Sequence, residues 1–164
     1  MTQQQAETVP ARSGPAPATT PRTPHVQLDQ FAPAEIQAEL WSRMAALEGV
    51  TTGPSGISFP SSRALHLDED AATGPEDAFL VGTEFAHLHG DGSGSLHLAL
   101  PLDVAHEVIA AGWAEQHPVV ALGLAHPTLV MLFGPRDADE LGLVWGLVRT
   151  SHAYARTGDV VRAR

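Results

Sequence analysis

Hydrophobic residues recur at three- and four-residue steps in three parts of the chain, as they do along a helix with one buried face. The first part spans residues 33–47, the second spans 101–111, and the third begins at Asp137. Pro33 suits a first helical turn, and Gly112 suits the position after a helix end. The pattern therefore predicts three helices distributed along the chain.

Between these helices the apolar residues come in short runs or alternate with polar ones, which is typical of strands. The runs predict strands over 57–59, 64–67, 79–89, 95–100 and 129–133. Residues 51–56 and the acidic stretch 68–77 are predicted loops, and 113–120 fits either a strand or a structured loop. This order predicts an α+β fold, a two-layer sandwich of an antiparallel sheet of about five to six strands covered by helices on one face. The other sheet face would be free to hold a pocket.

The strands 79–89 and 95–100 are expected to form a hairpin, because the residues between them are rich in glycine. In the second strand leucines alternate with other residues, so the leucines would enter the core and His97 would point to the opposite face. His87 and His89 would then share that face with His97. If the turn centres on Ser93, His89 lies opposite His97.

Domain boundaries follow from composition. Residues 1–28 are rich in Pro, Thr, Gln and Ala without hydrophobic periodicity, which predicts a tail that is disordered or extended, or that lies over the domain. Residues 29–158 are predicted to form a single domain, and 159–164 a short C-terminal tail.

The charge and composition of the chain limit the partners and the cellular compartment that we expect. The net charge is −10, with nine Arg and no Lys, which argues against nucleic acid or an anionic membrane as a partner. The chain has no cysteine, so disulfides, thiolate metal sites and a cysteine nucleophile are excluded. With no long apolar run and no secretory signal pattern, we expect a soluble cytoplasmic protein. The sequence does not indicate an oligomeric state.

Most of the chemically distinctive side chains gather in the predicted hairpin, as Glu84, His87, His89 and His97. Imidazole and carboxylate groups suit a divalent transition metal such as Zn, Fe, Mn, Ni or Cu, and these four residues are the candidate ligands. Glu84 has the opposite strand parity, so it joins the histidines only through a bulge or a twist of the strand. Two alternatives stay open: the three histidines act as acids and bases without a metal, or they are hydrogen-bonded groups that line a polar groove.

A second group of candidates lies outside the hairpin. Glu115 and His117 are two residues apart, and a carboxylate beside an imidazole can tune a catalytic base, so we count both as catalytic candidates. Arg63, Trp113 and Arg136 are candidate substrate-binding residues, since in a chain without Lys each Arg could anchor a carboxylate or phosphate. The competing interpretations are a core position for Trp113 and a structural ion pair for Arg136.

The chain has no P-loop, no dinucleotide-binding glycine pattern and no Gly-x-Ser-x-Gly motif. The first hypothesis is therefore an enzyme that oxidises or rearranges a small organic substrate without flavin or nicotinamide. The alternative is a non-catalytic module that binds a small ligand or another protein.

From about residue 65 to 155 the sequence resembles the small luciferase-domain family, which is named for a sponge luciferase and occurs in bacteria and fungi. The resemblance rests on the segments 64–67, 84–89, 95–98, 112–118, 133–137 and 140–141, which occur in the family's order. Gly90 stands where many members have Pro, and the segment 91–95 is longer, so the turn is expected to differ. The resemblance implies oxidation of a small organic molecule by oxygen, in specialised metabolism.

Overall fold

Six strands form one antiparallel sheet with the spatial order β1-β2-β3-β4-β6-β5. The computed structural model describes residues 8–163. The strands are β1 (Val50–Pro54), β2 (Arg63–Leu67), β3 (Glu84–Leu88), β4 (Leu96–Ala99), β5 (Ala114–Gln116) and β6 (Leu129–Leu132). The central strands β3 and β4 are buried along their whole length.

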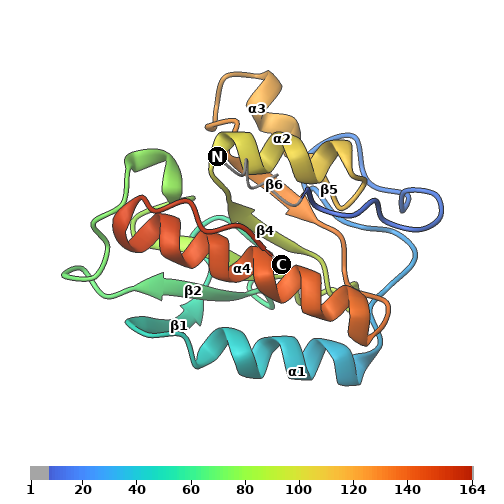
Figure 1. Cartoon of the computed structure of the whole chain (residues 1–164), viewed down its shortest axis with the longest axis horizontal. Helices are drawn as coiled ribbons and strands as arrows, with labels where there is room; N and C mark the ends of the chain where they lie inside the picture. Colours follow the sequence, from blue (N-terminus) through green and yellow to red (C-terminus); the bar gives the residue numbers. More distant parts are fainter. Residues whose placement is uncertain (1–7, 164) are drawn as a thin grey trace, which may run out of the picture.

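Three helices cover one face of this sheet. They are α1 (Ala34–Ala45), α2 (Leu102–Ala110) and α4 (Ala138–Thr157), and Figure 1 shows α4 crossing in front of the strands between the other two. Two shorter elements lie in connections, the 3-10 turn η1 (Glu76–Ala78) and the single-turn helix α3 (Pro118–Ala121). The predicted α+β sandwich, with an antiparallel sheet and its helices on one face, is confirmed.

The hydrophobic core lies between these helices and the sheet. Leu40 and Met44 of α1 and Leu147 of α4 are fully buried against strand residues such as Leu88 and Leu98. Because strand side chains alternate, the same strands present a different set of residues to the face away from the helices. That set contains the histidines.

The start of α4 is fixed by side chains close in sequence. The Asp137 carboxylate accepts a hydrogen bond from the Glu140 backbone N–H, which caps the helix. The Glu140 carboxylate accepts from the Arg136 backbone N–H and from its guanidinium group. Arg136 therefore serves the helix start, the structural interpretation considered above for this residue.

Two of the predicted strand and loop assignments were wrong. Residues 51–56, expected to be a loop, largely belong to β1, and 57–59, expected to be a strand, form a bend with no ladder partner. The β1 sequence has polar Thr51 and Thr52 and little apolar character, because β1 is an edge strand with exposed side chains. The stretch 113–120, which the sequence left open, contains both β5 and the start of α3.

The hairpin register also differs from the prediction. His87, not His89, lies opposite His97, and Leu88 pairs with Leu96. The turn centres on Gly92 rather than Ser93, so the ladder shifts by two residues. A two-residue shift preserves the face of every side chain, and all three histidines still share one side of the sheet.

The N-terminal segment, residues 8–31, lies along the domain as an irregular chain with several bends. Its backbone bonds to the domain at Arg12, whose N–H donates to the Ala111 carbonyl, and at Pro10, whose carbonyl accepts from the Trp113 indole N–H. Within the segment, residues 19 and 27 form an isolated antiparallel bridge. The first seven residues of the predicted tail, and residue 164, lie outside the described part of the chain.

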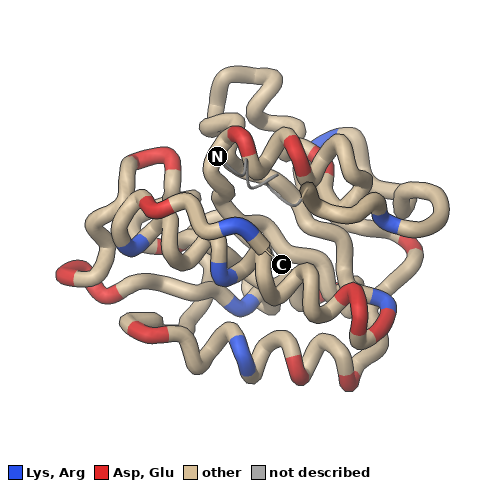
Figure 2. The backbone as a smooth tube through the Cα atoms, in the orientation of Figure 1, with Lys and Arg blue, Asp and Glu red and all other residues tan. Residues whose placement is uncertain are grey.

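Charged residues occupy the loops and helix surfaces around the molecule. The first turns of α1 and α4 carry acidic residues and their last turns carry an arginine, and Figure 2 shows acidic and basic positions along both helices. Within residues 8–163, no helix is long and apolar enough to cross a membrane.

Gly90 tests how tightly the loop between β1 and β2 packs on the hairpin. A Cβ atom at Gly90 would overlap the Ser61 carbonyl oxygen, so Gly90→Ala forces the backbone to move and should destabilise the fold by about 1–3 kcal/mol. Gly142→Ala is the matched control, because its Cβ would meet open space on α4 and should stabilise the fold by up to about 1 kcal/mol. Urea unfolding of both variants measures the difference. Equal stability of the two variants would contradict this packing.

Candidate active site

Five of the nine histidines gather on the sheet face that the helices leave uncovered. His87 and His89 come from β3 and its end, His97 from β4, His117 from the connection after β5, and His25 from the N-terminal segment. They line a cavity of about 280 Å³. Its remaining walls are Thr23, Pro24, Ile57, Ser58, Phe59, Pro60 and Leu129.

A bulge in β3 brings Glu84 to the histidine side. On β2, Leu65 pairs with Ala86 while the next residue, His66, pairs with Glu84, so Phe85 is an extra residue in the ladder. Phe85 packs in the core, and the parity of β3 is reset at this point. Of the bulge and the twist that the sequence left open for bringing Glu84 to the histidines, the structure has the bulge.

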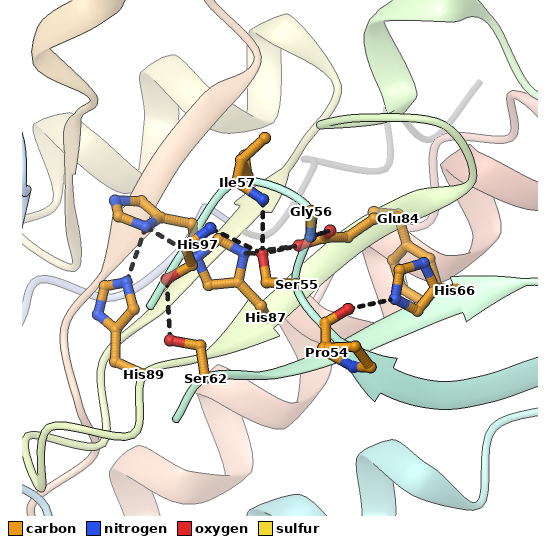
Figure 3. Close-up of polar contacts among 12 residues, drawn as sticks. Pro54, Ser55, Gly56, Ile57, Ser62, His66, Glu84, His87, His89 and His97 are labelled. Atoms are coloured by element: carbon orange, nitrogen blue, oxygen red, sulfur yellow. Dashed lines mark hydrogen bonds and ion pairs between the residues drawn. The ribbon is translucent and has the colours of Figure 1, made fainter. Parts of the chain in front are cut away.

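The Glu84 carboxylate fixes the proton of His87. It is fully buried and lies 2.8 Å from His87 Nδ1, and it also accepts hydrogen bonds from the Ser55 hydroxyl and the Gly56 N–H (Figure 3). Burial raises the pKa of Glu84, but these hydrogen bonds outweigh it and the net pKa is lowered. An ionised carboxylate only accepts, so His87 carries its proton on Nδ1 and has a free lone pair on Nε2.

A relay of hydroxyl groups fixes the proton of His89 in the same way. The Ser93 hydroxyl donates to the Asp91 carboxylate at 2.6 Å, so the proton between the Ser93 and Ser95 oxygens, 2.8 Å apart, belongs to Ser95. With its proton used, the Ser95 hydroxyl accepts from His89 Nδ1 at 2.8 Å. His89 therefore also has its free lone pair on Nε2.

A third relay fixes His97. The Glu115 carboxylate lies 2.6 Å from His25 Nε2, which therefore donates to it and leaves His25 Nδ1 as an acceptor. His25 Nδ1 lies 3.0 Å from His97 Nε2, so His97 donates from Nε2. The free lone pair of His97 is then on Nδ1, the opposite side of the ring.

These three free lone pairs point at one another. His97 Nδ1 lies 2.8 Å from His89 Nε2 and 3.2 Å from His87 Nε2, and Figure 3 shows the three rings drawn together. No proton remains to join these nitrogens while the three carboxylate relays are intact. Three unprotonated ring nitrogens at this spacing form a set that could hold a metal ion.

The environment keeps His89 and His97 neutral. Burial, reinforced by His87, lowers the pKa of His89 to about 4. Burial and the neighbouring imidazoles also lower the pKa of His97 well below its usual value. Protonation of the nitrogens that face one another is therefore unfavourable near neutral pH.

His117 belongs to a second group with His25 and His97 that also meets the distance requirement for a metal. However, His117 Nδ1 accepts a hydrogen bond from the Val119 N–H at the start of α3, so its proton is on Nε2. His25 likewise donates from Nε2 and accepts at Nδ1. The second group thus lacks the set of free lone pairs that the first has, and His117 offers the cavity an N–H donor. Burial lowers the pKa of His117 to about 4, which keeps it neutral.

The remaining candidates lie away from the cavity. Arg63 stacks on the Trp41 ring of α1, 4.4 Å from its centroid, on the helix side of the sheet. Trp113 is buried in the core with its indole N–H bonded to Pro10, and Arg136 pairs with Glu140. Glu115 reaches the site through His25 rather than by lining the cavity.

Sequence reasoning missed His25, Ser55 and the serines of the turn. His25 lies in a proline-rich segment without hydrophobic periodicity. The only signal in the sequence was that His25 is a further histidine in a chain where several others are close together. Ser95 had a detectable signal, because it precedes His97 by two residues and shares its strand face.

The protein is thus a two-layer α+β domain with a histidine-lined pocket on its open sheet face. Residues 82–151 match the family model described as Luciferase domain. The resemblance to the luciferase-domain family is therefore confirmed. The matched region contains His87, His89, His97 and the Glu115–His117 segment, and His25 lies outside it.

Fungal proteins named Luciferase are similar to the chain, two of them over most of its length. Those of Armillaria ostoyae and Armillaria gallica are 30% and 29% identical over 161 residues, covering 89% of this chain. The Luciferase of Neonothopanus nambi is 34% identical over 73 residues, covering 43% of this chain and 27% of that protein. The chain spans about 60% of the length of the Armillaria relatives. No solved structure matches the chain.

The neutral histidines make the stability of the metal-free fold dependent on pH. The unfolded chain binds protons at His89 and His97 as the pH falls below about 6.5, whereas the folded pKa of His89 is about 4. Stability is therefore fully present above pH 6.5 and declines from there toward pH 4, because unfolding takes up protons at His89, His97 and also His117, whose folded pKa is about 4. Urea unfolding of EDTA-treated protein at a series of pH values measures the decline. A free energy of unfolding that stays constant from pH 7.5 to 5 would contradict the neutral, buried state of these rings.

Proposed function

We propose that this protein is a small-molecule enzyme whose histidine pocket binds a divalent transition metal and oxidises an organic substrate without flavin or nicotinamide. The observation that carries the proposal is the convergence of three free lone pairs, on His87 Nε2, His89 Nε2 and His97 Nδ1. Each of the three rings is held from behind by a separate relay that ends at a carboxylate. Metal-binding histidines are commonly oriented by such hydrogen bonds.

The donor spacing supports this assignment. Two histidine nitrogens at Zn–N distances of about 2.0–2.1 Å lie about 3.3 Å apart in a tetrahedral site. The distances of 2.8 and 3.2 Å from His97 Nδ1 are close to that separation. Three protein ligands leave a further position for substrate or oxygen, which is typical of catalytic rather than structural metal sites.

Glu84, a candidate ligand on sequence grounds, takes a supporting role in this proposal. Both of its carboxylate oxygens already accept hydrogen bonds, from His87 and Ser55 on one side and Gly56 on the other. As the partner of His87 Nδ1 it increases the basicity of the ligating nitrogen.

The cavity walls indicate the kind of substrate. Ile57, Phe59 and Leu129 are apolar, and among the described residues that line the cavity none is Lys or Arg. The walls therefore favour an uncharged organic molecule, oriented by the His117 N–H. Oxidation by dioxygen is the reaction that the name of the fungal relatives suggests, and the metal would supply a site where oxygen and substrate meet.

Metal content of the untagged protein tests the proposal directly. We expect one equivalent of Zn, Fe, Mn, Ni or Cu per chain, lost on chelation and regained on addition of the metal. His97→Ala should abolish metal uptake and oxygen consumption with the substrate, while its melting temperature stays within a few degrees of the metal-free wild type.

His106→Ala is the matched control, since His106 is exposed on α2 and should leave metal content unchanged. Absence of stoichiometric metal, together with no tightening on metal addition, would refute the metal assignment and favour acid–base chemistry by the same histidines. Saturable ligand binding without turnover would favour the non-catalytic alternative.

A further inference from the structure

We propose that His25 is a positioning residue of the histidine site, so that the site binds its metal tightly only when the N-terminal segment is docked on the domain. This inference rests on the metal assignment proposed above. It concerns a residue outside the matched family region, in a segment whose composition is that of a tail.

The three ligands differ in where their supporting groups come from. The partner of His87 is Glu84, three residues away, and the partner of His89 is Ser95, across the same hairpin. The hairpin therefore orients two of the ligands by itself. His97 depends on His25, which is 72 residues away in the chain.

His25 is well placed to control His97. Its side chain is almost completely buried, with Nδ1 at 3.0 Å from His97 Nε2 and Nε2 at 2.6 Å from the Glu115 carboxylate. Without His25, the N–H of His97 would lose its acceptor, and nothing would hold the His97 proton on Nε2 rather than Nδ1. The free lone pair would then no longer be fixed toward His87 and His89.

The segment is fastened to the domain on both sides of His25. Before it, Arg12 and Pro10 bond to the end of α2 and to Trp113. After it, the buried Gln27 side chain accepts a hydrogen bond from the Gly134 N–H, and the Ala32 N–H donates to the Ser93 carbonyl. Residues 23–25 also form one wall of the cavity, so docking of the segment and closure of the site are the same event.

The affinity of the protein for Co²⁺, measured by competition with a chelator, tests this inference. His25→Leu removes the acceptor and should weaken binding by about 10- to 100-fold, with the stoichiometry still one per chain at saturation. His25→Asn places an amide oxygen near the position of Nδ1 and should recover most of that affinity. Asp29→Ala is the matched control. Among the described residues the Asp29 carboxylate bonds only to the Ala18 N–H of the same segment, so the affinity should not change.

A second readout reports on the ring itself. Nitrogen-15 NMR of the metal-free wild type should show His97 with a protonated Nε2 and an unprotonated Nδ1, and His25→Leu should lose this preference. Glu115→Ala is the substitute variant if His25→Leu does not fold, because the Glu115 side chain is partly exposed. It removes the acceptor of His25 and should also weaken Co²⁺ binding.

The outcomes separate the two proposals. If the wild type binds Co²⁺ and His25→Leu binds it equally well with an unchanged His97 tautomer, the role of His25 is refuted and the metal site stands. If the wild type and all variants fail to bind Co²⁺, the metal assignment is refuted and this inference falls with it.

Discussion

Mutual repulsion among three unprotonated ring nitrogens is the constraint on which the site depends. Left alone, His87, His89 and His97 would relieve it by a change of tautomer, which would place a proton between two of the rings. The relays that end at Glu84, Asp91 and Glu115 prevent this change, because each carboxylate holds a proton on the far side of its histidine. The rest of the architecture serves to keep these three acceptors in place.

The sheet divides the molecule into two chemically different halves. On one side, leucines of β3 and β4 pack under α1, α2 and α4 and supply most of the burial that stabilises the fold. On the other side, the same strands carry buried imidazoles whose polar atoms find partners in loops and in the N-terminal segment. Burying that many polar groups is costly unless each is hydrogen-bonded. Among the described residues, the buried side-chain atoms without such a bond are Arg12 Nε and the three ring nitrogens that face one another without a proton between them.

The alternation of leucine and histidine made the shared face of His87, His89 and His97 predictable from sequence. The face was right although the register was wrong, since the true turn centre differs by one residue and side-chain direction repeats every two. The edge strand β1 was not predictable from periodicity, because it has no buried face and its signal is the pairing with β2.

The contribution of His25 could not be derived from local patterns at all. Its segment has no hydrophobic period, and its position is set by single contacts such as those of Pro10 and Gln27 with the domain. Contacts between residues so far apart in the chain produce no pattern of spacing in the local sequence, so they cannot be predicted from it. The supporting role of Ser95, by contrast, follows from strand parity once the face of His97 is known.

Because of the extra residue at Phe85, the turn of the hairpin and the strand β3 differ in whether they tolerate insertions and deletions. The extra residue lets one short strand place an aromatic ring among the helices and, one position earlier, a carboxylate behind His87. Lengthening the glycine turn by two residues would leave every donor on its own side of the sheet. An insertion or deletion of one residue between Glu84 and His87 would instead move the Glu84 side chain to the helix face of the sheet. Length changes are therefore better tolerated in the turn than in this part of β3.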